Sequence, residues 1–158
     1  MIINVSQGLG TGKTELSAFD KALYEAGVAN YNLVRLSSVI PVGAEVKINQ
    51  LSDNARNEFG YKLFLVYAEQ RESEIGKEAW AGVGWVQTED GRGLFVEHEG
   101  SSEKEVRGLI KNSLTDMVKY RKDYKFGEIN YSVCGIRCED QPVCAFMAAV
   151  YQSQSWDK

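Results

Sequence analysis

One segment near the end of the chain limits the possible folds more than any other. Residues 143–151 read Val-Cys-Ala-Phe-Met-Ala-Ala-Val-Tyr, so both faces of an extended strand would be apolar. Successive side chains point to opposite faces of a sheet, and such a strand therefore needs a covering layer on each side. We expect residues 143–151 to form a central strand that is buried on both faces.

The rest of the chain reads as strands, mostly consecutive, and two helices. A helix is expected over residues 14–26, where Leu16, Phe19 and Leu23 recur at helical spacing and Gly27 suits the position after the last turn. A longer helix should run from a capping box at Ser102 to about residue 124. Strands are expected at residues 2–5, 31–40, 44–48, 61–69, 79–87, 92–98 and 128–138. This order predicts an α+β fold: one domain over residues 1–158, built as a four-layer α/β/β/α sandwich of mainly antiparallel sheets.

Composition excludes several classes of protein. The 158 residues are 44% hydrophobic and 25% charged, with a net charge of −4, which is typical of a globular domain and not of a disordered chain. The sequence has no basic cluster, so a nucleic-acid partner is not expected. No apolar stretch approaches the roughly 20 residues needed to cross a bilayer. The first residues lack a basic segment followed by a long apolar core, so no signal peptide is expected. Three cysteines, an odd number, favour reduced thiols in a cytoplasmic protein.

A glycine-rich segment, Gly-Leu-Gly-Thr-Gly-Lys-Thr at residues 8–14, ends like a phosphate-binding loop. The spacing of that motif requires a glycine five positions before Gly12, where this chain has Gln7. We expect residues 8–12 to form a flexible loop before the first helix. A nucleotide-binding or regulatory module that uses this loop remains an alternative function.

The metal-ligating residue types are few. Cys134, Cys138, Cys144 and the single His98 would allow a four-ligand zinc site, but the chain has no Cys-x-x-Cys pair. Free cysteines are usually buried in apolar surroundings. We therefore expect three buried thiols and no metal site.

Two serines, Ser37 and Ser38, follow an apolar strand and precede Pro41. With the surrounding segments they make the chain resemble the pyruvoyl-dependent arginine decarboxylases, over about residues 5–151. The segments that carry this resemblance are Asn-Tyr-Asn-Leu-Val-Arg-Leu-Ser-Ser-Val-Ile-Pro (30–41), Gly-Thr-Gly-Lys-Thr-Glu-Leu-Ser-Ala-Phe-Asp-Lys-Ala-Leu (10–23), Val-Glu-His-Glu-Gly (96–100) and Cys-Ala-Phe-Met-Ala-Ala (144–149).

The resemblance implies that the chain cuts itself at the Ser37–Ser38 bond. The hydroxyl of Ser38 would attack the carbonyl of Ser37, and elimination would release residues 1–37, the β chain, from residues 38–158, the α chain. Residue 38 would become a covalent pyruvoyl group. That group forms a Schiff base with the substrate amine and accepts the electrons freed when CO₂ leaves. Neither pyridoxal phosphate nor a metal is then needed.

The resemblance also implies roles for particular side chains. Glu97 would return a proton to the substrate, although Glu99, on the same strand face, stays open as the donor. Asp20 would pair with the substrate guanidinium through two parallel hydrogen bonds, and Leu33 would line the pocket. Asn32 would donate a hydrogen bond near the cleavage carbonyl or the pyruvoyl oxygen.

Asn32 and Ser38 cannot meet if residues 31–40 form one straight strand. Six residues at about 3.3 Å each would separate them by roughly 20 Å. The strand therefore bends sharply, or the Asn32 that meets a given Ser38 comes from another subunit. We favour the second arrangement, because the resemblance implies a trimer or a dimer of trimers.

The expected activity is conversion of arginine to agmatine and CO₂ in the cytoplasm, for polyamine synthesis or for acid consumption. Other functions remain open: the same chemistry on another amino acid, since small pocket changes alter specificity, or an inactive, unprocessed relative.

Overall fold

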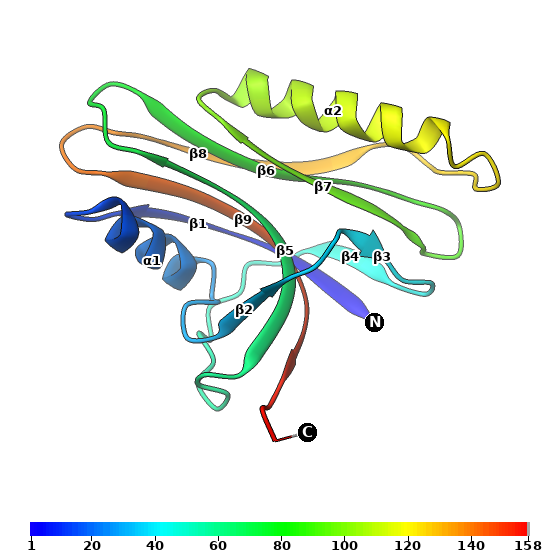
Figure 1. Ribbon diagram of the computed structural model, residues 1–158, viewed down its shortest axis with the longest axis horizontal. Coiled ribbons are helices and arrows are strands. Elements are labelled where there is room, and N and C mark those ends of the chain that lie inside the picture. The colour runs from blue at the N-terminus through cyan, green and yellow to red at the C-terminus, as the bar shows by residue number, and fades with distance from the viewer. Residues whose placement is uncertain (158) are drawn as a thin grey trace.

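A computed structural model describes residues 1–157 as two stacked β-sheets with one helix on each outer face (Figure 1). This confirms the four-layer α+β sandwich. The five-stranded sheet has the order β2 (Asn32–Arg35), β5 (Lys62–Glu72), β9 (Val143–Gln154), β1 (Ile2–Thr11) and β4 (Glu45–Ile48). The four-stranded sheet has the order β3 (Val39–Ile40), β7 (Gly93–Gly100), β6 (Glu78–Gln87) and β8 (Asn130–Arg137). The helices are α1 (Glu15–Glu25) and α2 (Glu103–Lys119). The pairs β1–β4 and β2–β5 are parallel, and the other pairs are antiparallel.

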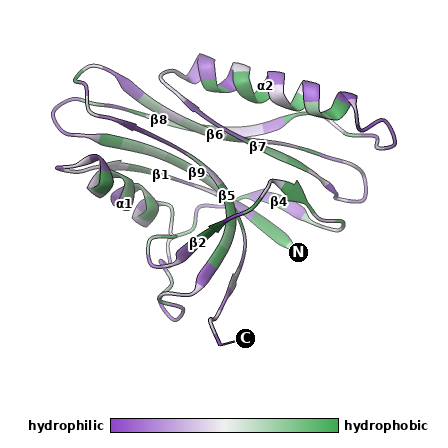
Figure 2. Ribbon diagram, viewed as in Figure 1, coloured by the Kyte–Doolittle hydropathy of each residue, from purple (hydrophilic) through white to green (hydrophobic). Residues whose placement is uncertain are grey.

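Strand β9 occupies the centre of the larger sheet, as its two apolar faces predict. Residues 143–150 are all buried, and the strand pairs with β5 on one side and β1 on the other. Phe146 and Ala148 face α1, whereas Met147 and Ala149 face the other sheet. Figure 2 shows the apolar colour continuing along β9 and β5. Because each face of β9 contributes to a different apolar layer, this strand joins two of the three layers of the core.

Helix α1 begins and ends close to the predicted residues. Thr14 caps its N-terminus by accepting a hydrogen bond from the Ser17 amide, and Gly27 follows the C-terminus with φ of +81°. The buried face differs from the expected one. Ala18 and Ala22 point into the core, whereas Leu16 is 67% exposed. Small side chains face the sheet because the helix lies very close to β1.

The glycine-rich segment explains that close approach and corrects the expectation of a loop. Gly8 and Gly10 lie within β1, which runs on to Thr11 instead of ending near residue 5. A Cβ atom at Gly8 would overlap the carbonyl oxygen of Ala22, and one at Gly10 would overlap that of Ala18. These glycines allow a helix to pack directly on a strand. The predicted flexible loop over residues 8–12 is wrong, and residues 4–11 are paired with β9.

The predicted strand over residues 31–40 is also wrong in one respect, because it is broken. Residues 32–35 form β2 in the five-stranded sheet, and residues 39–40 form β3 in the other sheet. Residues 36–38 carry the chain from one sheet to the other. The one predicted strand therefore becomes two short edge strands, and the Ser37–Ser38 bond lies in the crossing segment.

Helix α2 starts at the predicted cap. Ser102 accepts a hydrogen bond from the Glu105 amide at 3.1 Å, and the Glu105 carboxylate accepts one from the Ser101 amide at 2.9 Å. The helix ends at Lys119, and turns occupy the residues up to 124 that the prediction had included.

Candidate active site

The crossing segment between β2 and β3 holds Ser38 in an unusual backbone conformation. Ser38 has φ of +76°, in the left-handed region that residues other than glycine rarely adopt. Hydrogen bonds fix the backbone around it: the Leu36 amide donates to the Leu65 carbonyl at 2.9 Å, and the Phe95 amide donates to the Ser38 carbonyl at 2.8 Å. Such a conformation costs on the order of 1–3 kcal/mol and persists only where the surroundings impose it. The strain therefore lies at the predicted cleavage bond.

Strand β7 brings Glu97 to this serine. The Ser38 hydroxyl lies 2.7 Å from Oε1 and 2.9 Å from Oε2 of Glu97. Alternation along β7 turns Phe95 and Glu97 toward the other sheet, while His98 points to α2 and lies 2.7 Å from the Ser113 hydroxyl. The sheet pairing thus brings the Glu97 carboxylate within hydrogen-bond distance of the hydroxyl of Ser38, which lies 59 positions earlier in the chain.

Burial raises the pKa of Glu97 above its ordinary value, because a carboxylate loses solvation between the sheets. The hydrogen bond from Ser38 and the positive charge of Arg35 act in the opposite direction, and the negative charge of Glu99 adds a smaller rise. Glu99 itself is exposed, and no hydrogen bond within residues 1–157 joins it to Ser38. Of the two carboxylates, Glu97 is the one in contact with the serine.

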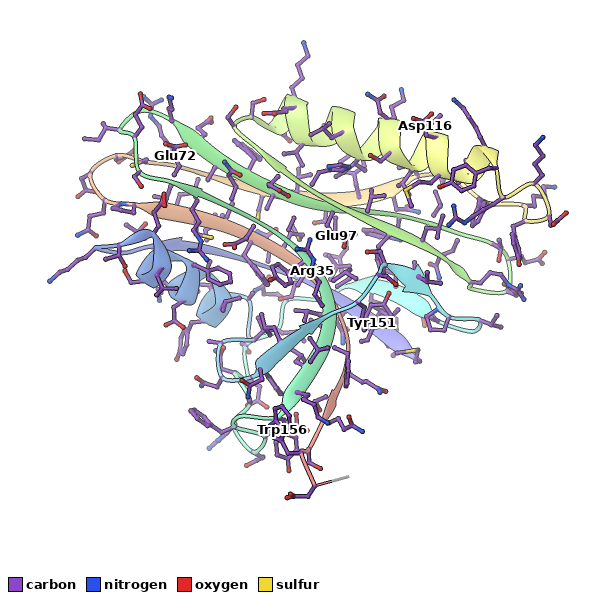
Figure 3. The ribbon with its side chains drawn as sticks, in the orientation of Figure 1. Arg35, Glu72, Glu97, Asp116, Tyr151 and Trp156 are labelled. Atoms are coloured by element: carbon purple, nitrogen blue, oxygen red, sulfur yellow. The ribbon has the colours of Figure 1, made fainter. Side chains whose placement is uncertain are left out.

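Tyr151, near the outer end of β9, contacts the residue after Ser38. Its hydroxyl donates to the Val39 carbonyl at 2.9 Å, and its ring packs edge-on against Phe95 with centroids 6.1 Å apart. Figure 3 labels Tyr151 with Glu97 and Arg35. Arg35 donates to the Tyr67 carbonyl at 2.9 Å and lies over the Tyr67 ring.

The other predicted site residues lie elsewhere in this chain. The Asn32 side chain donates to the Gly60 carbonyl at 2.6 Å, and no hydrogen bond in the described part of the chain links it to Ser38. Leu33 packs with the apolar cluster under α1. Asp20 is exposed on α1 and has no ion pair among residues 1–157. The structure therefore brings together Ser38 and Glu97, and it places Asn32, Leu33 and Asp20 away from that pair.

Sequence reasoning missed Tyr151, Arg35 and the backbone amide of Phe95. Tyr151 was included only as the end of an apolar strand, and nothing in its neighbours indicates a polar partner 112 residues away. A backbone amide is not specific to any side chain, so no feature of the sequence could have pointed to the amide of Phe95.

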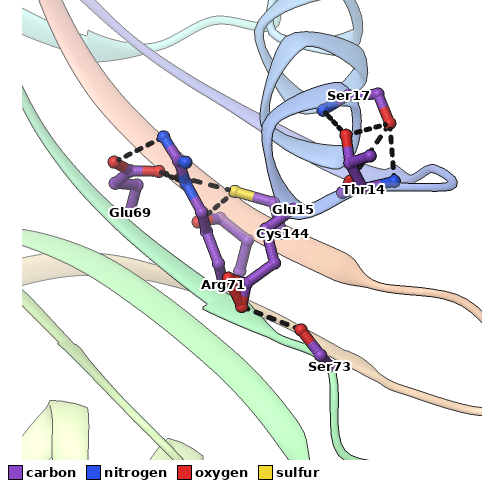
Figure 4. Close-up of polar contacts among 8 residues, drawn as sticks. Thr14, Glu15, Ser17, Glu69, Arg71, Ser73 and Cys144 are labelled. Atoms are coloured by element: carbon purple, nitrogen blue, oxygen red, sulfur yellow. Dashed lines mark hydrogen bonds and ion pairs between the residues drawn. The ribbon is translucent and has the colours of Figure 1, made fainter.

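The cysteines and the histidine lie in different layers. Cys134 and Cys138 are buried between the sheets, whereas Cys144 is buried under α1 beside Glu69 and Arg71, as Figure 4 shows. Burial raises the pKa of Cys134 to about 12. The prediction of buried free thiols is confirmed. Over residues 1–157 no cluster of three metal-ligating side chains occurs, and no helix is long and apolar enough to cross a membrane.

The residues around Ser38 fit the formation of a pyruvoyl group. The precursor of that group is a serine. The hydroxyl of Ser38 is hydrogen-bonded to a carboxylate, its backbone is strained, and its carbonyl accepts a hydrogen bond. The same carbonyl would remain next to the keto group after conversion, with the Phe95 amide on its oxygen. Nothing in the arrangement requires a metal ligand.

Comparison with known proteins gives one consistent result. The family model described as "Pyruvoyl-dependent arginine decarboxylase (PvlArgDC)" matches residues 2–155. A protein of that name from Thermococcus sibiricus is 36% identical over 141 residues, which is 88% of this chain and 87% of the relative. The Pyrococcus abyssi protein of the same name is 35% identical over 142 residues, with the same coverage. The Halobacterium salinarum protein is 38% identical over 95 residues, 60% of this chain and 58% of the relative.

Proposed function

The chain belongs to the pyruvoyl-dependent arginine decarboxylase family, and on that premise we propose that it cuts itself at Ser37–Ser38 and then converts arginine to agmatine and CO₂. The observation that carries the first half of this proposal is the contact between the Ser38 hydroxyl and the Glu97 carboxylate at 2.7 Å. A serine hydroxyl is a weak nucleophile until an adjacent base accepts its proton. The contact supports Glu97 as that base.

The cleavage step balances without any further reagent except water. Glu97 takes the proton from the Ser38 hydroxyl, and Oγ attacks the carbonyl carbon of Ser37. The C–N bond of the amide breaks, the Ser38 nitrogen takes up a proton, and an ester joins the two residues. In the elimination a base takes the Cα proton of residue 38, a Cα=Cβ double bond forms and the Cβ–Oγ bond breaks, releasing residues 1–37 with a carboxylate at Ser37. The dehydroalanine left at position 38 takes up one water and loses ammonia to give the pyruvoyl group. The left-handed φ of Ser38 favours this reaction, because breaking the amide releases strain.

In decarboxylation the pyruvoyl group supplies an electron sink for the negative charge left when CO₂ departs. The chain's own residues hold that site. The Phe95 amide donates to the carbonyl oxygen of residue 38, where negative charge would collect. Glu97 carries the proton for the substrate α-carbon, and its raised pKa keeps a larger fraction protonated at a given pH.

We further propose that a second copy of the chain completes the site, in a trimer or a dimer of trimers. Within residues 1–157 no hydrogen bond reaches the Ser37 carbonyl, whose oxygen gains charge during attack. Asn32, Leu33 and Asp20 lie away from Ser38 in their own chain, and a neighbour could present them. Asn32 would then donate to that oxygen, Leu33 would line the pocket, and Asp20 would hold the guanidinium with two parallel hydrogen bonds. We place the enzyme in the cytoplasm, which suits three buried, unpaired thiols.

The substrate is tested by incubating purified protein with arginine, lysine or ornithine and measuring CO₂ and the amine formed. Arginine should be decarboxylated with the highest kcat/KM. Comparable rates on lysine or ornithine would contradict a guanidinium-specific site, because their ammonium groups cannot make the paired hydrogen bonds.

A further inference from the structure

Within the described chain, Tyr151 makes the one side-chain hydrogen bond to the backbone of residues 38–42, just after the cleavage bond. Its hydroxyl donates to the Val39 carbonyl at 2.9 Å, across the gap between the two sheets. Tyr151 belongs to β9 at the centre of the larger sheet, and Val39 belongs to β3 at the edge of the smaller one. The contact therefore ties the edge of one sheet to the core strand of the other.

Strand β3 depends on this tie because it is very short. It has two residues, Val39 and Ile40, paired only with β7. The Val39 side chain is 60% exposed and contributes little packing. After cleavage, residue 38 becomes the first residue of the larger fragment, and new chain ends fray unless they are tied down. Besides the buried side chain of Ile40, the Phe95 amide, the short β3 pairing and the Tyr151 hydroxyl would then hold this end.

The tyrosine is suited to a permanent donor role. Its ring packs on Phe95, the residue whose amide binds the Ser38 carbonyl, so the two anchors support each other. Burial, followed by the nearby negative charge of Glu97, raises the pKa of Tyr151 well above its ordinary value. The hydroxyl therefore keeps its proton at neutral pH, where it can donate to the Val39 carbonyl.

We propose, on the basis of the function proposed above, that Tyr151 is a positioning residue: its hydrogen bond to the Val39 carbonyl keeps Ser38 against Glu97 before cleavage and holds the new chain end in the site afterwards. Among residues 1–157, no hydrogen bond joins Tyr151 to the scissile amide or to the Ser38 hydroxyl, and we propose that it acts through the backbone of β3.

The test is the Tyr151→Phe variant, which keeps the ring on Phe95 and removes only the hydroxyl. We expect self-cleavage to slow by roughly three- to tenfold, which corresponds to the loss of one ordinary hydrogen bond. The rate is measured from the intact mass of samples taken after refolding. In the cleaved enzyme kcat should fall by a similar factor with KM for arginine nearly unchanged. The control is Tyr131→Phe, which removes a hydroxyl from a partly exposed tyrosine on β8 and should leave both rates unchanged.

A second readout separates positioning from a general loss of stability. Hydrogen–deuterium exchange is measured on Ser38→Ala and on Ser38→Ala/Tyr151→Phe, neither of which can cleave. Faster exchange confined to residues 37–42 supports the proposal. Unchanged exchange there, or unchanged cleavage by Tyr151→Phe while the native chain cleaves normally, overturns it. A native chain that never cleaves would instead contradict the proposed function itself.

Discussion

Ser38 and Glu97 are 59 residues apart in the chain, yet the serine hydroxyl lies within 2.9 Å of both carboxylate oxygens. The contact exists because the chain changes sheets between β2 and β3, which brings Ser38 opposite Phe95 and beside the next inward-facing residue of β7. A serine hydroxyl, a buried carboxylate and a strained backbone conformation thus meet in the uncut chain.

The environment of Glu97 predicts a pH effect on stability. In Ser38→Ala, loss of the hydroxyl removes a hydrogen bond that favours the carboxylate, so the pKa of Glu97 should lie further above its ordinary value of 4.5. The folded state then binds this proton more tightly than the unfolded state. The free energy of unfolding should therefore fall as pH rises from about 4.5 through the folded-state pKa.

Urea unfolding of Ser38→Ala between pH 4 and 8 measures this slope, and a carbon NMR titration of the carboxyl group measures the pKa directly. In the Ser38→Ala background, Glu97→Gln should remove this pH dependence of the free energy of unfolding. Glu99→Gln, which changes an exposed carboxyl group, should leave the pH dependence in place. Parallel stability curves for Ser38→Ala and Ser38→Ala/Glu97→Gln would show that the pKa is not raised.

Asp20 offers a test of guanidinium binding that does not involve the cleavage site. It is exposed and has no ion pair among residues 1–157, so Asp20→Asn should leave stability and self-cleavage unchanged. Loss of a charged, paired hydrogen bond should raise KM for arginine by about tenfold or more. Asp116→Asn, at an exposed position on α2 where the carboxylate pairs with Lys119, is the control. Equal KM values for the two variants would remove Asp20 from the substrate site.

The role of Asn32 across subunits is tested by mixing two inactive chains. Asn32→Ala retains Ser38 but lacks the amide, and Ser38→Ala retains the amide but lacks the nucleophile. If the amide acts on a neighbouring chain, co-refolding the two should speed cleavage of the Asn32→Ala chains, seen as their fragments in the mass spectrum. Cleavage no faster than in Asn32→Ala alone would place the amide's action within its own chain.

The glycines of β1 predict a contrast in stability. Gly10→Ala would push a methyl group into the Ala18 carbonyl of α1 and should cost at least about 2 kcal/mol. Gly108→Ala lies in the interior of α2 with no atom within 4 Å of the new methyl group. It should raise the free energy of unfolding by about 0.5–1 kcal/mol. Denaturant unfolding of the two variants in the uncut Ser38→Ala chain measures both. A neutral Gly10→Ala would mean that α1 can move away from β1.

The features predicted correctly from the residues were those set by local periodicity. The two apolar faces of residues 143–151 indicated the central strand, and the spacing over residues 14–26 indicated α1. The glycines of residues 8–12 were misinterpreted because glycine permits both a loop and close packing, and the deciding contacts come from a helix that follows them.

The break in residues 31–40 was missed for a related reason. Leu36, Ser38 and Ile40 would lie on one face of a continuous strand, so the sequence gives no sign of a break. The break arises because residues 32–35 pair with one sheet and residues 39–40 pair with the other. Ser38 and Glu97 were identified through the family resemblance and not from spacing. Tyr151 was placed only in the last strand and not at the site, since a hydroxyl that binds a backbone carbonyl leaves no pattern in the neighbouring residues.

The most direct test of the central claim is the intact mass of the purified protein beside that of Ser38→Ala. The account predicts two polypeptides from the native chain, residues 1–37 and residues 38–158, the larger without a free amino terminus and labelled by a carbonyl reagent. Ser38→Ala should give one uncut chain without label. A native preparation that forms agmatine from arginine while remaining a single unlabelled chain would contradict the account.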